Sequence, residues 1–210
     1  EESVTGEDEV VEASEAAREA VRVMKEYNDM DLFPMQLQIL DTVLGSGSGL
    51  SNYDVTGLRH DVCVCAPTGS GKTLAYCLPL VMRLRSRSVR RLQALILLPT
   101  RDLAAQVKQT FDDTAAAFGT DLVSVLLCGQ RSFVQEQTLL LRNSVSAVDV
   151  AVCTPGRLTD HIDFTAGFSL RNLRYLVLDE ADRLLQQAYQ DWLRKILAAV
   201  SVTTMPSVVE

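Results

Sequence analysis

Short apolar runs alternate along this chain with longer amphipathic segments, and the alternation predicts how the chain folds. The runs are rich in valine, leucine and isoleucine and almost continuously apolar, which is typical of parallel strands covered on both faces. The predicted strands are Asp61–Ala66, Leu92–Leu98, Leu122–Cys128, Val148–Cys153 and Tyr175–Leu178.

Between the strands lie segments with a helical repeat. The clearest is Arg101–Phe118, in which apolar residues recur at steps of three and four. Lys72–Arg87, Trp192–Val200 and a helix that contains Leu139–Leu141 complete the pattern. Strands alternating with helices predict an α/β fold, a doubly wound and mostly parallel sheet with helices on both faces. In such sheets ligands bind beyond the carboxyl ends of the strands.

Charge is concentrated at the amino-terminal end. The chain has 210 residues, 47% of them hydrophobic, and a net charge of −7. Eight acidic residues and one arginine fall within the first 20 residues, so this segment carries the whole net charge. We expect an acidic arm, residues 1–28, partly helical or disordered, attached to an electrically balanced domain over residues 29–210. Within that domain, Gly45–Ser51 is expected to be a flexible loop.

The balance of charge and the cysteines narrow the class of protein. A neutral domain argues against a polybasic nucleic-acid binder, but not against one that grips a few phosphates through backbone amides. The cysteines have no metal-ligand spacing, so we expect reduced core thiols in an intracellular, reducing compartment. The cysteines are Cys63, Cys65, Cys77, Cys128 and Cys153.

No apolar run approaches the roughly 18 residues of a membrane span. We expect no membrane contact and a monomer.

The strongest chemical signal is a glycine-rich loop between the first predicted strand and the helix after it. Small residues let backbone N–H groups curl around phosphate oxygens, and the helix start adds its positive end. Lys72 is expected to reach the outer phosphates of a nucleotide, and the Thr73 hydroxyl to help hold Mg²⁺. Ala66 stands where the pattern usually has glycine. The loop consists of Ala66, Pro67, Thr68, Gly69, Ser70, Gly71, Lys72 and Thr73.

A second signal is a group of acids at the end of the last predicted strand. Asp179 and Glu180 directly follow the apolar run Tyr175–Leu178, as the metal-binding strand of a phosphate-loop enzyme requires. Asp179 is expected to bind Mg²⁺, largely through water, and Glu180 to orient and deprotonate the attacking water. Taken alone, these acids also suit the first turn of a helix.

The sequence Asp179-Glu180-Ala181-Asp182 after this loop resembles the DEAD-box family of ATP-dependent RNA helicases, and the segments between them agree. Pro99-Thr100-Arg101 resembles one family motif, and Thr154-Pro155-Gly156-Arg157 another. Gly129-Gln130 stands where the family usually has Gly-Gly, so only the first glycine is retained. The resemblance implies a RecA-like domain that binds ATP and Mg²⁺, with Asp182 coupling the motifs. It also implies that three elements touch the backbone of single-stranded or structured RNA. The residues assigned to RNA are Pro99, Thr100, Arg101, Gly129, Thr154, Pro155, Gly156 and Arg157.

A weaker resemblance lies upstream, where Phe33-Pro34-Met35-Gln36 is similar to the adenine-reading motif of this family. Gln36 is the candidate reader, because its amide can both donate to and accept from a base edge. Phe33 replaces the usual threonine, and Glu19 stands where the family has an aromatic residue. Gln36 therefore also fits a plain helix-start glutamine.

Two further segments resemble the subgroup that acts in large ribosomal subunit assembly. They are Arg59–Cys65 and Asp160–Leu170. This resemblance implies pre-ribosomal RNA as substrate, ribosome assembly factors as partners, and the nucleus and nucleolus as location. His60 and His161 have no partner with catalytic or metal spacing, and both are expected in surface loops.

Residues 183–210 hold no Ser-Ala-Thr motif, and no second domain follows, so we expect a truncated helicase domain that is nearly inactive by itself. Two other functions remain open from the residues. One is a DNA translocase, which shares the phosphate loop and the acids. The other is a nucleotide-gated module that binds RNA or protein without unwinding.

Overall fold

The computed structural model describes residues 14–44, 61–67, 69–142, 145–186 and 191–201. The chain divides into two units, Glu1–Ala75 and Tyr76–Glu210, and each is described by itself. Thr68, His60 and the loop Gly45–Ser51 lie outside the described residues.

In the described part of the first unit, helices α1 (Glu15–Asn28) and α2 (Pro34–Leu44) contact each other. Helix α1 begins where the Ser14 hydroxyl accepts the N–H of Ala17 at 3.0 Å, and it ends at Asp29, whose φ of 51° is left-handed. The buried face of α1 consists of alanines and Met24. The described part of the expected acidic arm is therefore helical.

The second unit is built around a four-stranded parallel sheet in the order β2-β5-β1-β6. A short antiparallel pair, β3-β4, lies outside it. The strands are β1 (Ala94–Leu97), β2 (Ser124–Leu127), β3 (Leu141–Arg142), β4 (Val145–Ser146), β5 (Val150–Cys153) and β6 (Tyr175–Leu178). The helices are α3 (Lys72–Leu84), which begins in the first unit, α4 (Arg101–Ala117), α5 (Phe133–Leu140), α6 (Pro155–Phe164), α7 (Ala181–Gln186) and α8 (Trp192–Ser201).

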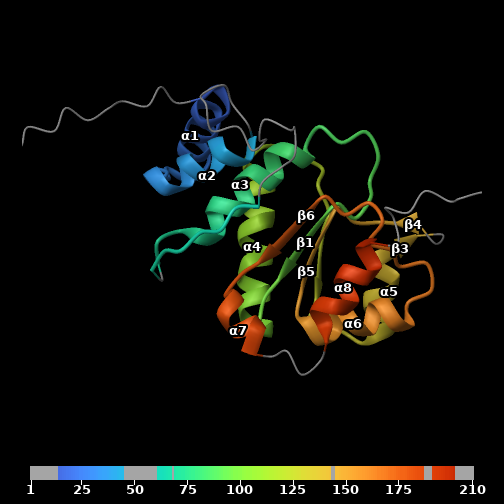
Figure 1. The fold of residues 1–210 in the computed structure, drawn as a ribbon. Coiled ribbons are helices and arrows are strands. Elements are labelled where there is room, and N and C mark those ends of the chain that lie inside the picture. Colours follow the sequence, from blue (N-terminus) through green and yellow to red (C-terminus); the bar gives the residue numbers. More distant parts are fainter. Residues whose placement is uncertain (1–13, 45–60, 68, 143–144, 187–190, 202–210) are drawn as a thin grey trace, which may run out of the picture. The chain divides into compact units, whose positions relative to one another are not determined.

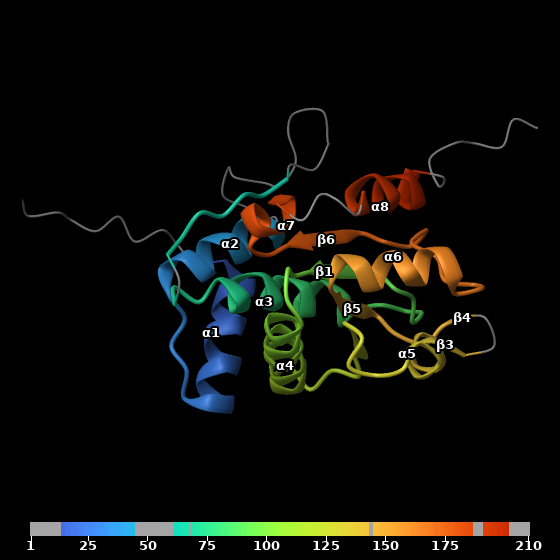
Figure 2. The ribbon, with the colours of Figure 1, turned by 90° about the horizontal axis from the view of Figure 1, so that it is seen from below.

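Helices cover both faces of this sheet, as Figures 1 and 2 show for α4 on one side and α8 on the other. Successive strand residues point to opposite faces. Ile96 of β1 packs with Phe111 of α4, whereas its neighbour Leu97 packs with Trp192 of α8 and Leu158 of α6. Both faces are apolar, which is why β1 and β5 consist entirely of buried residues. The predicted doubly wound α/β sheet is confirmed.

One predicted strand is absent. Asp61–Ala66 has no strand in the structure, and Val62 and Val64 are 43% and 38% exposed. An apolar run becomes a strand only where a neighbour pairs its N–H and C=O groups, and no described strand pairs with this segment. Cys63 and Cys65 within it are exposed, so the prediction of core thiols was wrong for these two. Cys77, Cys128 and Cys153 are buried, as predicted, and burial raises the pKa of each thiol.

None of the helices in the described part of the chain is long and apolar enough to cross a membrane.

Candidate functional site

Four of the expected motifs leave the sheet at one edge. Leu97 of β1 is in register with Cys153 of β5 and with Leu178 of β6, and Leu127 of β2 is in register with Cys153. The motif residues begin within two positions of these strand ends. Because all four strands are parallel, their carboxyl ends share one edge, as the sequence predicted. The order β2-β5-β1-β6 sets the three elements assigned to RNA side by side and puts Asp179 next to them.

The glycines of the phosphate loop adopt a backbone that other residues rarely adopt. Gly69 has a φ of +83° and Gly71 one of +79°. A Cβ at Gly71 would lie 2.4 Å from Nε2 of Gln36, whereas a Cβ at Gly69 would meet nothing within 4 Å. The loop therefore needs glycine at 69 for conformation and at 71 for both conformation and space.

Polar groups of the same loop fit a phosphate ligand. Among the described residues the buried hydroxyl of Ser70 has no hydrogen-bond partner, although a buried hydroxyl is costly to leave unpaired. The Lys72 ammonium, first in α3, donates to the carbonyl of Ala66 and, at 2.8 Å, to that of Pro67. Thr73 follows in the same turn. A hydroxyl, an ammonium and a helix start in one loop are the donor set that phosphate oxygens bind.

Gln36 is tied to the phosphate loop. Its Nε2 donates to the carbonyl of Gly71 at 3.1 Å, and its Oε1 accepts the N–H of Phe33 at 2.8 Å. The side chain is 2% exposed. Each end of the amide keeps one further hydrogen-bonding site, although the side chain is almost fully buried. The two candidate functions of this unit, base reading and phosphate binding, are thus joined by one side chain.

Asp179 emerges from β6 with its carboxylate already oriented. Its Oδ2 accepts from the Tyr76 hydroxyl at 2.8 Å, and its Oδ1 accepts the N–H of Glu180 at 2.9 Å. Its own N–H continues the sheet by donating to Leu97 at 3.0 Å. Sequence reasoning missed Tyr76, because nothing in the pattern links a tyrosine in α3 to an aspartate 103 positions later.

Glu180 has a strained backbone, since its φ of 49° is left-handed in a residue with a Cβ. Its Oε2 lies 2.8 Å from Nη1 of Arg183, yet that oxygen is buried and makes no hydrogen bond of acceptable angle. We regard the contact as an ion pair of poor geometry, which leaves this oxygen able to accept from a ligand. Asp182 is exposed in the first turn of α7.

The elements assigned to RNA converge at Gly129. Its φ is +76°, and a Cβ there would lie 3.6 Å from Nη2 of Arg101 and 3.9 Å from Nε of Arg157. Arg101 follows β1, Gly129 follows β2 and Arg157 follows β5. Two guanidinium groups beside an open backbone turn form a site that suits a phosphodiester anion.

Two helix starts border this site. Thr100 caps α4 by accepting the N–H of Leu103 at 3.4 Å. Thr154, by contrast, makes no side-chain cap for α6, which begins with Pro155 and Gly156. The first amides of a helix have no partner within it, so α6 offers donors to an anion. Pro99 lies in the turn that leads into α4.

The position of His161 differs from the one expected from the sequence. The residue is fully buried in α6 and does not lie in a surface loop. Its Nδ1 lies 2.8 Å from the Thr165 hydroxyl, its Nε2 lies 3.0 Å from Oε2 of Glu136, and its ring stacks on Phe133 at 4.6 Å. Burial lowers the pKa of His161, and Glu136 opposes that shift. His161 lies three residues after Leu158, on the buried face of α6, and this helical spacing was the signal that sequence reasoning overlooked.

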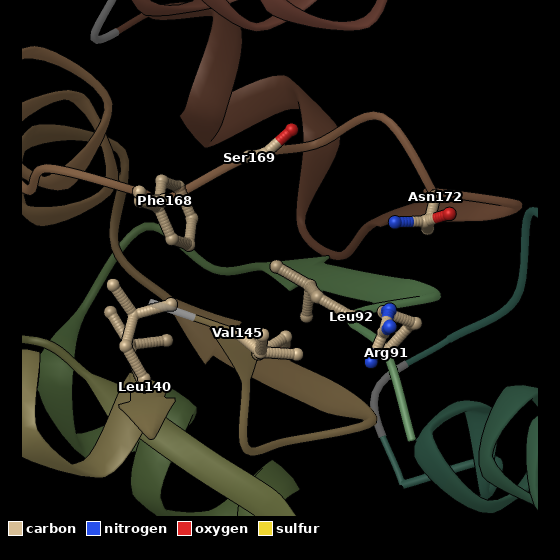
Figure 3. A pocket seen from close by; sticks show the side chains of 10 residues that line it. Arg91, Leu92, Leu140, Val145, Phe168, Ser169 and Asn172 are labelled. Carbon is tan, nitrogen blue, oxygen red and sulfur yellow. The ribbon is translucent and has the colours of Figure 1, made fainter. Parts of the chain in front are cut away.

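A pocket of about 180 Å³ lies elsewhere in the second unit (Figure 3). It lies at the amino end of β1, where Leu92 and Phe168 face it, so it is separate from the motif edge. None of the motif residues lines it. Its lining is Arg91, Leu92, Leu140, Leu141, Val145, Ser146, Gly167, Phe168, Ser169 and Asn172.

Comparison with solved structures agrees with this architecture. A DEAD box protein from Methanococcus jannaschii matches with a TM-score of 0.68 and 25% identity, over 94% of this chain and 50% of that chain. The yeast DEAD-box splicing factor Prp28 matches with a TM-score of 0.70 and 27% identity, over 90% of this chain and 41% of that chain. The fold is therefore that of RecA-like helicase domains.

Sequence comparison is more specific. DEAD-box ATP-dependent RNA helicase 1 of Arabidopsis thaliana is 47% identical over 183 residues, 79% of this chain and 33% of the relative. ATP-dependent RNA helicase DDX51 of Danio rerio is 46% identical over 176 residues, 81% of this chain and 27% of the relative. The chain thus spans a third or less of the length of these relatives. A family model described as DEAD/DEAH box helicase matches residues 33–209, and the chain therefore belongs to the DEAD/DEAH box helicase family.

Proposed function

We propose that the chain is the ATP-binding part of an ATP-dependent RNA helicase, in which ATP binding and hydrolysis drive local separation of RNA strands. The observation that carries the proposal is the convergence of Arg101, Gly129 and Arg157 at the carboxyl edge of the sheet. The neighbouring strand β6 delivers Asp179 and Glu180 to the same edge. One edge thus carries donors for an RNA backbone and acids for phosphoryl transfer.

The nucleotide chemistry follows from named groups. Lys72 and the amides around Gly69, Ser70 and Gly71 bind the phosphates of ATP, and Gln36 contacts adenine. Thr73 would contribute its hydroxyl to Mg²⁺, and Asp179 would contribute its carboxylate, largely through water. Glu180 orients the attacking water, and Asp182 couples this motif to the others. Mg²⁺ supplies charge neutralisation between the phosphates when it is bound.

We propose that phosphoryl transfer also uses a group from outside this chain. In this proposal residues 29–210 form the ATP-binding domain, the segment 1–28 is an arm attached to it, and a second domain supplies an arginine to the transition state. Such an arginine contributes several orders of magnitude in rate. We therefore expect the chain alone to bind ATP weakly and to hydrolyse it negligibly.

The proposed RNA is pre-ribosomal, which implies action in the nucleolus together with ribosome assembly factors. Support comes from the segments Arg59–Cys65 and Asp160–Leu170, which resemble the ribosome-assembly subgroup. Similarity to relatives named ATP-dependent RNA helicase DDX51 and dbp6, at 46% and 42% identity, supports the RNA helicase function.

Removing either converging arginine is expected to weaken RNA binding. For Arg101→Gln and for Arg157→Gln, affinity for single-stranded RNA should fall whatever the base sequence, because each guanidinium contacts phosphate. The slope of log affinity against log salt should fall by about one for each. Fluorescence anisotropy of a labelled oligouridylate, titrated with the chain at several low salt concentrations, measures both.

Arg194→Gln is the matched control. Arg194 is 83% exposed in α8, pairs with Asp191 and belongs to none of the RNA motifs, so its removal should leave the slope unchanged. A deoxyoligonucleotide of matching sequence should bind more weakly, because only RNA offers the 2′-hydroxyl. Equal loss of affinity in all three variants, or equal binding of DNA, would count against the proposed RNA site.

A further inference from the structure

A buried carboxylate lies directly beneath the site assigned to RNA. Glu136 in α5 is 1% exposed, although nothing in the sequence pattern gave it a function. Its Oε1 accepts the N–H of Gly129 at 3.1 Å, and its Oε2 accepts from Nε of Arg157 at 2.6 Å. One side chain thus holds the turn after β2 and the arginine after β5.

The charge of this carboxylate requires partners, because a buried ion is stable only when it is paired and hydrogen-bonded. Arg157, 19% exposed, is the counter-charge. The carboxylate accepts only, so Nε2 of His161, 3.0 Å away, carries the hydrogen between them, and Nδ1 accepts from the Thr165 hydroxyl. Glu136 is therefore satisfied from three directions, and its own side chain is 1% exposed.

The guanidinium of Arg157 is held mainly through Nε, so its two outer nitrogens, Nη1 and Nη2, are less restrained than Nε. Its Nε is committed to Glu136, and its guanidinium lies 4.9 Å from the centre of the Phe133 ring. By contrast, Nη2 makes only a long contact of 3.3 Å to the carbonyl of Arg131, and Nη1 lies 3.7 Å from Asp160. A phosphate can replace such weak contacts, whereas the short contact to Glu136 persists.

We propose that Glu136 is a positioning residue for RNA binding: its single carboxylate sets the backbone of Gly129 and the guanidinium of Arg157 in one arrangement that fits a phosphodiester. This inference rests on the proposed RNA-binding function. Glu136 acts through its two partners and does not touch the RNA. An acid is used because glutamine, its nearest isostere, has one acceptor oxygen and cannot serve both partners.

Glu136→Gln tests the proposal in the full chain. We expect RNA affinity to fall about tenfold, and the salt slope to fall by about one, as for Arg157→Gln. The double variant Glu136→Gln/Arg157→Gln should lose less affinity than the sum of the two single losses, because both changes act on the same phosphate contact of Arg157. Affinity for ATP should be unchanged.

Gln135→Ala separates positioning from helix stability. Gln135 is the neighbouring residue in α5 and completes the capping box with Ser132, but it contacts neither Gly129 nor Arg157. Its removal should lower the melting temperature and leave RNA affinity intact. If Glu136→Gln does the same, with parental RNA affinity and slope, Glu136 has only a structural role and the inference is wrong.

Arg157→Lys keeps the test decisive if Glu136→Gln does not fold. A lysine ammonium keeps the charge but cannot pair with Glu136 and present a second edge to phosphate at the same time. We expect Arg157→Lys to lose nearly as much affinity as Arg157→Gln. Full affinity in Arg157→Lys would overturn the inference and leave the proposed function standing. No effect of Arg157→Gln itself would overturn both.

Discussion

Replacing Gly71 with alanine is expected to abolish measurable nucleotide binding, with a loss of affinity above about 100-fold. The new Cβ would lie 2.4 Å from Nε2 of Gln36, which is 2% exposed and tied at both ends of its amide. The φ of +79° adds backbone strain of about 1–3 kcal/mol. Alanine therefore distorts the loop and displaces Gln36 together. Isothermal titration calorimetry with ATP and Mg²⁺ measures the loss.

Gly69→Ala is the matched control for strain without crowding. Gly69 has nearly the same φ, +83°, but open space where the Cβ would go. We expect a smaller loss, about tenfold, from strain alone. The double variant Gln36→Ala/Gly71→Ala should regain part of the phosphate affinity without base selectivity. Equal effects at Gly69 and Gly71 would contradict the packing of Gln36 on the loop.

The largest expected loss of stability follows replacement of Asp149 by alanine. Asp149 is fully buried and accepts from Arg87, whose side chain is 6% exposed, and from the N–H of Val123 at 2.9 Å. Removing one partner of a buried pair costs about 3–5 kcal/mol. Without Asp149, Arg87 would keep the exposed Asp121 as its counter-charge. For a chain of this size the melting temperature should fall by roughly 6–20 °C, as circular dichroism can measure.

Asp121→Ala distinguishes burial from charge. Asp121 pairs with the same Arg87 at 2.9 Å, but its side chain is 79% exposed. Arg87 lowers the pKa of Asp121, yet water screens an exposed pair, so the melting temperature should barely change. If Asp121→Ala destabilises the chain as much as Asp149→Ala, the buried pair is not what holds β2 and β5 in place.

The two central strands of the sheet, β1 and β5, could be predicted because they are buried on both faces. β1 and β5 pack Leu97 and Cys153 against one layer of helices and Ile96 and Val152 against the other, so neither strand has a polar side. Such runs are visible without any knowledge of neighbours. Helix α4 was visible for a similar local reason, since its apolar residues recur at helical steps.

Asp61–Ala66 illustrates where the same reasoning fails. Its apolar residues satisfy the strand pattern, but a strand also needs a paired neighbour, and periodicity does not reveal whether one exists. The prediction that His161 lies in a surface loop failed for the opposite reason. His161 was judged as an isolated histidine, whereas its position on the buried face of α6 is set by helical spacing.

The candidate site shows the same division between local and distant information. Lys72, Gly71 and Asp179 could be found because each belongs to a short sequence motif that directly follows a predicted strand. Glu136 and Tyr76 act through partners from other elements, Gly129 and Arg157 for the first and Asp179 for the second. Only the tertiary structure pairs such residues, although a charged residue on the buried face of α5 is itself a signal.

Calorimetric titration of the chain with ATP, and separately with GTP, in the presence of Mg²⁺ tests the central claim most directly. The account predicts that ATP binds more tightly than GTP and that Lys72→Ala abolishes both signals. Lys108→Ala, which removes a surface lysine paired with Asp112, should change neither. If ATP does not bind, or binds equally well to Lys72→Ala, the loop from Ala66 to Thr73 is not a nucleotide site and the proposed helicase function is contradicted.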